Sequence, residues 1–300
     1  MSFTGNVKSE VFLLERLLPE KISELSAIIY NSERTNYIKV TTENASVARF
    51  TFKTIKELYD ISPKITVRKG YNFKKNYIYI LEIKEKVDLL LKDLGISNSL
   101  PPSYLYDDEE LERAYLRGVF LMTGSVNDPK TSRYHLEMIF SDKKYAELIK
   151  KLLNHFRLNA KIIKKENKYM VYMKEAEKIS DFLRIIKAMN AVMYFEDIRI
   201  YRDHKNMTNR LNNCEQANVD KMIESSYDMI RKIEILKEND MYDLLDDKVK
   251  EASEYRCKYP EVSLAELSQI ISIETGKQIT KSGLHHRLKK IDDLVEKARD

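Results

Sequence analysis

The sequence predicts an α+β domain built from two repeats, followed by an all-α helix-turn-helix domain. The order helix, strand, helix, hairpin and helix occurs twice before residue 203, offset by roughly 90–100 residues, which indicates an internal duplication. Near the C-terminus, two short amphipathic helices flank a polar turn, and the second is rich in basic residues. With 300 residues, 43% of them hydrophobic, the chain is long enough to bury a sizeable core.

The first repeat is expected to span residues 1–96. Apolar spacing and turn residues divide it into helices and strands. The expected order is helix 2–17, helix 19–29, strand 37–42, helix 45–59, hairpin strands 65–68 and 77–83, and helix 87–94. The hairpin turn is placed at Lys69-Gly70-Tyr71-Asn72, and Gly95 ends the last helix.

The second repeat, residues 104–203, follows a linker that contains Pro101 and Pro102. The expected order is helix 108–122, strand 134–140, helix 142–156, hairpin strands 160–163 and 169–173, and helix 175–189. Gly118 fits close packing between the two repeat helices, and Gly124 fits a helix C-cap. Two such copies most simply pair around a pseudo-twofold axis, with their strands merged into one saddle. Two unrelated α/β patterns remain the alternative.

Residues 204–243 are predicted to form a connector helix. The segment 210–218 is dense in Asn and Gln, which favour caps and turns but also bond backbone or phosphate groups. A long amphipathic helix is expected after it, with Val219, Ile223 and Ile230 on one face.

Residues 244–300 are predicted to form a helix-turn-helix domain that binds double-stranded DNA. A first helix covers 246–259, and Ser263 with Glu266 forms a capping box for the next one. Gly276 permits a positive φ in the turn, and Thr280 caps the last helix. That helix carries donors suited to phosphates and base edges. The residues expected to contact DNA are Ser263, Thr280, Lys281, Ser282, Gly283, His285, His286, Arg287, Lys289 and Lys290. An ordinary amphipathic surface helix is the alternative.

Charge and cysteine content limit the kinds of binding site that the chain can carry. Lys+Arg 52 against Asp+Glu 47 gives a net charge of +5, so a nucleic-acid surface must come from local clustering. Lysines at 164–165 and 168, and basic residues at 68–69 and 74–75, mark both hairpins; they fit a DNA backbone, an acidic partner or plain solvation. Cys214 and Cys257 have no zinc-motif spacing, so we expect free thiols, no metal and no cofactor. Without a signal peptide or membrane-length apolar run, a cytoplasmic, nucleoid-associated protein is expected.

Several blocks of the sequence resemble the WhiA family. They are 113–126, 134–137, 200–203, 210–218 and 281–289, and together they extend the similarity over essentially the whole chain. The resemblance implies a bacterial DNA-binding regulator linked to cell division, chromosome segregation and sporulation. It also implies a degenerate LAGLIDADG endonuclease-like domain joined to the helix-turn-helix. The resemblance also allows other transcription or division proteins as partners.

The same resemblance provides a test for nuclease activity. Active LAGLIDADG enzymes end each repeat helix in a carboxylate that holds a divalent metal, but Thr123 and Ser32 stand at those positions. Glu33 lies one residue late, a rotation of about 100° around a helix. We therefore expect no catalytic residues and no enzyme activity. The alternatives are a residual nuclease and a non-regulatory scaffold of division or chromosome segregation.

Overall fold

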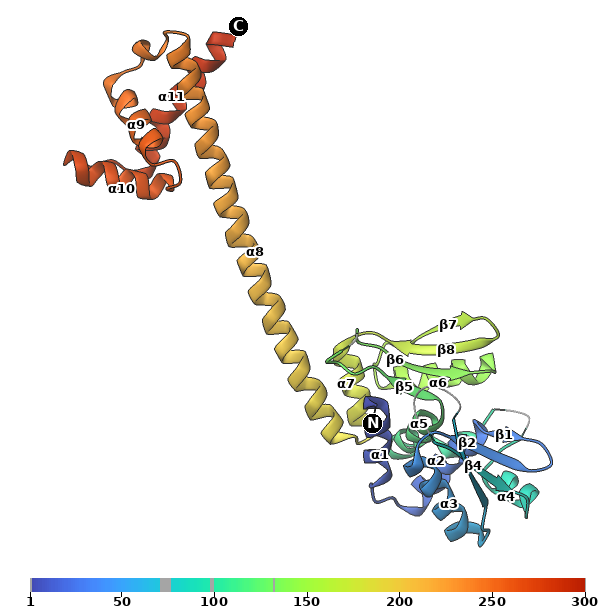
Figure 1. The fold of residues 1–300 in the computed structure, drawn as a ribbon. Helices are drawn as coiled ribbons and strands as arrows, with labels where there is room; N and C mark the ends of the chain where they lie inside the picture. Colours follow the sequence, from blue (N-terminus) through green and yellow to red (C-terminus); the bar gives the residue numbers. More distant parts are fainter. Residues whose placement is uncertain (1, 71–76, 98–99, 132, 300) are drawn as a thin grey trace. The chain divides into compact units, whose positions relative to one another are not determined.

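The computed structural model describes residues 2–70, 77–97, 100–131 and 133–299. It divides into two compact units, Met1–Arg202 and Asp203–Asp300. Helix α8 (Met189–Glu238) is continuous and contributes to both units (Figure 1). None of the helices in the described ranges is long and apolar enough to cross a membrane.

The first repeat of unit 1 combines helices with one antiparallel sheet. Its elements are α1 (Phe3–Phe12), α2 (Leu18–Tyr30), β1 (Glu33–Arg34), β2 (Ile38–Thr42), α3 (Ala45–Tyr59), β3 (Lys64–Lys69), β4 (Tyr77–Ile83) and α4 (Val87–Asp93). The strand order is β1-β2-β4-β3. Tyr71 and Asn72 of the predicted hairpin turn, and the basic pair at 74–75, lie outside the described residues.

The second repeat has the same construction. Its elements are η1 (Ser103–Leu105), α5 (Glu109–Thr123), β5 (Gly124–Val126), β6 (Leu136–Phe140), α6 (Lys143–His155), β7 (Lys161–Lys165), β8 (Lys168–Met173) and α7 (Ala176–Ile185). The strand order β5-β6-β8-β7 repeats that of the first sheet, which confirms the predicted duplication. The expected merging of all strands into one saddle is wrong, because the strands of each repeat form a separate four-stranded sheet.

Local sequence signals explain why matching elements form in the two repeats. Asn44 caps α3 by accepting hydrogen bonds from Ser46 N at 2.8 Å and Val47 N at 3.2 Å. Asp142 caps α6 in the same way through the backbone of Lys144 and Tyr145. Alternation along the strands then buries one face of each sheet beneath these helices. The buried strand residues include Ile38, Val40, Leu81 and Ile83 in the first sheet and Leu136, Met138, Val171 and Met173 in the second.

Helices α2 and α5 pack side by side and join the two repeats (Figure 1). A Cβ on Gly118 would lie 2.3 Å from the carbonyl oxygen of Glu24 and 2.8 Å from Cβ of Ala27, so only glycine permits this approach. The predicted packing role of Gly118 is confirmed. Gly124 follows α5 as predicted, but its backbone is extended (φ −83°), and its lack of a side chain instead leaves space for the Phe120 ring.

Unit 2 is a helical bundle around the C-terminal part of α8. It contains η2 (Tyr242–Leu244), α9 (Asp247–Lys258), α10 (Leu264–Thr275) and α11 (Lys281–Arg299). Its core includes Ile233, Leu236, Val249, Ala252, Leu267, Ile271, Leu284, Leu288 and Ile291. The predicted first helix of this domain is confirmed by α9.

Helix α8 runs without a break through the amide-rich segment 210–218 and begins before residue 204, where the connector helix was expected to start. No Gly or Pro interrupts the sequence between Met189 and Glu238. Polar side chains in this part bond along the helix, as when Gln216 Nε2 donates to Asp220 Oδ1 at 2.8 Å. The closing helix predicted at 175–189 is split, because α7 ends at Ile185 and Lys187 adopts a positive φ of 61° before α8 begins.

Candidate nucleic-acid interface

Helix α10 begins with the predicted capping box. Ser263 Oγ accepts from Glu266 N at 3.2 Å, and Glu266 Oε2 accepts from Ser263 N at 2.9 Å. These bonds lower the pKa of the Glu266 carboxyl group. The hydroxyl group of Ser263 is therefore engaged in the helix cap.

The turn between α10 and α11 is held by one hydroxyl and one glycine. Gly276 ends α10 with a φ of 67°, as predicted. Ser272 Oγ accepts from Ile279 N at 3.0 Å and donates to Ser268 O at 2.7 Å. Thr280 Oγ1 then accepts from Gly283 N at 3.1 Å, which confirms the predicted cap of α11. The two helices therefore meet through a closed, hydrogen-bonded turn.

Buried and exposed residues divide the N-terminal half of α11 cleanly. Leu284, Leu288 and Ile291 are buried in the bundle core. The opposite side carries exposed side chains that lie within about 140° of the helix circumference. They are Lys281, Ser282, His285, His286 and Lys289. We call these five residues the α11 face.

Two of the expected DNA donors lie away from the α11 face and already have partners. Arg287 is partly buried, with Nη1 3.3 Å from Glu251 Oε2 in α9. Lys290 Nζ lies 2.8 Å from Asp246 Oδ2, which lowers the pKa of that carboxyl group. Gly283 contributes backbone to the cap. The structure therefore brings five of the ten predicted residues together and separates the others.

A buried arginine that the sequence analysis missed fixes the loop before α10. Arg256 is 2% exposed, and its Nη1 donates to Val262 O at 2.8 Å, Ser226 Oγ at 3.0 Å and Tyr259 O at 3.2 Å. Burial lowers the pKa of its guanidinium group. The side chain ties α8, the end of α9 and the loop together, so it positions the helix-turn-helix. Its only sequence signal was a basic residue shortly before Pro260.

The ends of α2 and α5 do not fit a divalent metal. Ser32 Oγ donates to Ile28 O at 2.8 Å and Thr123 Oγ1 donates to Val119 O at 2.9 Å, so each hydroxyl is bonded within its own helix. Glu33 lies on β1 and pairs with Lys39 Nζ at 2.9 Å. Within the described ranges, no cluster of three His, Cys, Asp or Glu residues has metal-binding geometry. Neutral hydroxyls cannot replace the carboxylates that hard cations need.

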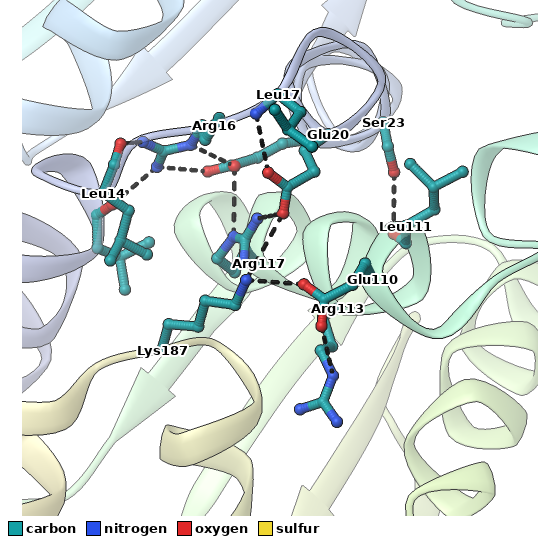
Figure 2. A network of polar contacts seen from close by, with 12 residues as sticks. Leu14, Arg16, Leu17, Glu20, Ser23, Glu110, Leu111, Arg113, Arg117 and Lys187 are labelled. Atoms are coloured by element: carbon teal, nitrogen blue, oxygen red, sulfur yellow. Dashed lines mark hydrogen bonds and ion pairs between the residues drawn. The ribbon is translucent and has the colours of Figure 1, made fainter.

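Buried charge, instead, occupies the α2–α5 interface (Figure 2). Arg117 is 1% exposed, and its guanidinium lies 3.2 Å from Glu20 Oε1 and 3.4 Å from Glu24 Oε2. Arg16 Nε donates to the same oxygen of Glu24 at 2.7 Å, and Arg16 Nη2 donates to Glu24 Oε1 at 3.0 Å. Burial opposes ionisation of Glu20, but hydrogen bonds from Leu17 N and Arg117 outweigh it and hold its pKa below the ordinary value. These ion pairs join the two repeats.

Three family profiles match the chain in order. They are the WhiA N-terminal LAGLIDADG-like domain over residues 20–97, the WhiA LAGLIDADG-like domain over 112–205 and the WhiA C-terminal HTH domain over 208–295. The two repeats and the bundle described above thus correspond to three recognised domains.

Full-length relatives agree with these profiles. A protein from Oceanobacillus iheyensis named "Probable cell division protein WhiA" is 41% identical over 312 aligned positions, covering 100% of this chain and 98% of the relative. One of the same name from Bacillus cereus is 42% identical with the same coverage. The crystal structure of full-length WhiA from T. maritima is 26% identical, with a TM-score of 0.59 and 99% of each chain covered. This chain belongs to the WhiA family.

Proposed function

We propose that this protein binds double-stranded DNA sequence-specifically through α11 and regulates transcription connected with cell division, chromosome segregation and, in sporulating lineages, sporulation. The observation that carries the proposal is the α11 face. It presents two lysines and three hydrogen-bonding side chains above a buried apolar stripe, the arrangement expected of a helix that enters a major groove. The link to division rests on the names of the relatives.

The charge pattern limits the contact to the first half of α11. Farther along the same side, Asp293 and Glu296 are exposed, and carboxylates repel the phosphate backbone. Recognition helices of this motif contact bases mainly with their N-terminal residues. We therefore propose that the DNA contact ends near Lys290. Ser263 and Thr280 support this contact as caps.

A salt-series binding titration on genomic DNA fragments tests the proposal. The variant is Lys281→Ala with Lys289→Ala, and the matched control is Lys221→Ala with Lys248→Ala, two exposed lysines of unit 2 that lie off the α11 face. Loss of two phosphate contacts lowers the slope of log K against log salt by about 2. An equal effect of both pairs, or no sequence selectivity in the unaltered protein, would reject the proposal.

We infer that the repeat domain is not a nuclease. Support comes from the internally bonded hydroxyls of Ser32 and Thr123 and from the pairing of Glu33 with Lys39. Incubation of the full chain with plasmid and Mg²⁺ should leave the plasmid intact. Site-specific cleavage that disappears in Glu33→Gln would identify a residual active site and overturn this inference.

The proposal extends to the limits of the functional segments and to the location of the protein in the cell. We propose functional segments at 1–96, 104–203, 204–243 and 244–300, with the last as the DNA reader. A DNA-binding regulator is expected to associate with the nucleoid, in the cytoplasm. Imaging a fluorescent fusion against a DNA stain tests this, and the Lys281→Ala, Lys289→Ala variant should lose the overlap.

A protein-binding role has one specific observation in its favour. Ile139 and Ile163 are exposed on one face of the second sheet, and both pair with Met170 on the strand between them. Such an apolar row suits a transcription or division protein better than phosphates. Under that alternative, Ile163→Ser would abolish partner binding, and partner binding would change little with salt.

A further inference from the structure

The second repeat contains a hollow that the proposed DNA contact does not use. Its volume is about 570 Å³, within the range of pockets for small ligands. It is bordered by the segment after β5, the residues that lead into β6, the residue after β8 and one residue of α8. The lining residues are Asn127, Arg133, Tyr134, His135, Lys174 and Arg202.

The lining is strongly basic. Three of the six residues are Arg or Lys, a fourth is His135, and none is acidic. His135 Nε2 lies 3.0 Å from Oε2 of Glu137, which is not itself a lining residue. Arg133 and Lys174 are exposed and form no ion pair with any residue in the described ranges. Positive charges that converge on a hollow with no acidic lining residue favour an anionic ligand.

Hydrogen bonds within the protein hold this arrangement in place. Arg202 Nη1 donates to Pro129 O at 2.7 Å, and its guanidinium lies 5.1 Å from the centre of the Tyr134 ring. Asn127 Nδ2 donates to Arg133 O at 3.0 Å, and its backbone N–H donates to His135 O at 2.9 Å. The Tyr134 hydroxyl is buried and has no hydrogen-bond partner in the described part of the chain. The loop and α8 are thus positioned before any ligand arrives.

We propose that this hollow binds a small ligand of nucleotide size that carries at least two linked phosphate groups. Arginine guanidinium groups bind phosphate oxygens in a bidentate manner, and Lys174 adds a mobile point charge. Two linked phosphates match the charge of Arg133, Lys174 and Arg202 better than a single carboxylate does. The charges also converge on one ligand-sized volume, whereas a duplex backbone needs them spread along its length.

Isothermal titration of the full chain with inorganic pyrophosphate tests the proposal, at constant ionic strength. The variant is Arg133→Ala with Lys174→Ala, both exposed positions whose truncation leaves the core intact. The control is Lys144→Ala with Lys151→Ala, exposed lysines of α6 in the same repeat. We expect binding by the unaltered protein and the control, weakened about tenfold or more in the hollow variant. No binding at millimolar pyrophosphate, or equal weakening in the control, would overturn the proposal.

A second arm separates a small ligand from DNA. Each variant is titrated with a nonspecific duplex, and the hollow variant is expected to bind it as the control does. If the hollow variant loses duplex affinity beyond the control and pyrophosphate does not compete with the duplex, the hollow belongs to a DNA-backbone surface. That result would overturn the proposal and leave the role of the α11 face untouched.

Discussion

The guanidinium group of Arg287 in α11 lies 3.3 Å from the carboxylate of Glu251 in α9. Arg287 therefore reaches DNA only if it exchanges this partner for a base or phosphate. If it contacts a base, Arg287→Ala should weaken specific binding by about 1–3 kcal/mol. Glu251→Gln should retain or increase affinity, because it removes the competing carboxylate. Affinities on the specific site and a scrambled site check this.

A purely structural Arg287 gives a different pattern. Both substitutions would then lower the melting temperature by similar small amounts, since exposed or partly exposed ion pairs contribute about 0–1 kcal/mol. Unchanged DNA affinity in Arg287→Ala with the fold intact would exclude a base contact by Arg287.

Ser263→Ala should destabilise unit 2 through the loss of its capping box. The backbone N–H of Glu266 loses its acceptor at 3.2 Å, and N-cap losses of this kind cost about 1 kcal/mol. Urea unfolding followed by the circular dichroism of the full chain measures it. Ser263→Asp should restore most of the loss because aspartate also caps helices. If Ser263→Ala reduces DNA affinity without lowering stability, Ser263 contacts DNA directly.

The features that sequence predicted best are local ones. The caps at Ser263 and Thr280 depend on neighbours within three residues, and the two repeats are visible as one order of helices and strands that occurs twice. The five residues of the α11 face were also among the predicted DNA contacts, but the sequence prediction grouped Arg287 and Lys290 with them.

The features that sequence missed depend on distant partners or on context. Arg117 bonds Glu20 across 97 residues, and Arg256 reaches Ser226 across 30, so no local pattern signals either contact. The same holds for Glu251, which pairs with Arg287 across 36 residues, whereas the place of Arg287 off the α11 face follows from helical spacing. For the amide-rich stretch at 210–218, residue preference left caps and turns open, but the stretch continues a long helix because no Gly or Pro stops it.

Gly118→Ala should disrupt the contact between the repeats. The added methyl would lie 2.3 Å from a backbone oxygen of α2, which cannot yield as a flexible side chain does. We expect a loss of about 1–3 kcal/mol or more in the stability of unit 1, measured by denaturant unfolding. Gly283→Ala is the matched control, because its nearest neighbour is Thr280 Oγ1 at 3.4 Å and a helical Gly→Ala change favours the helix. Equal effects of the two substitutions would contradict the packing role of Gly118.

Glu20 should make the α2–α5 interface sensitive to acid. Its pKa lies below the ordinary value of 4.5 in the folded protein, so its stabilising effect is fully present above about pH 4.5 and is lost as the pH falls through the folded pKa. Melting temperatures of the unaltered protein and Glu20→Gln, compared from pH 7 to pH 3, should differ most at neutral pH and converge in acid. The control is Glu57→Gln, which removes an exposed partner of Lys21 outside this network. A difference that stays constant across the pH range would show that Glu20 acts through packing and not through its charge.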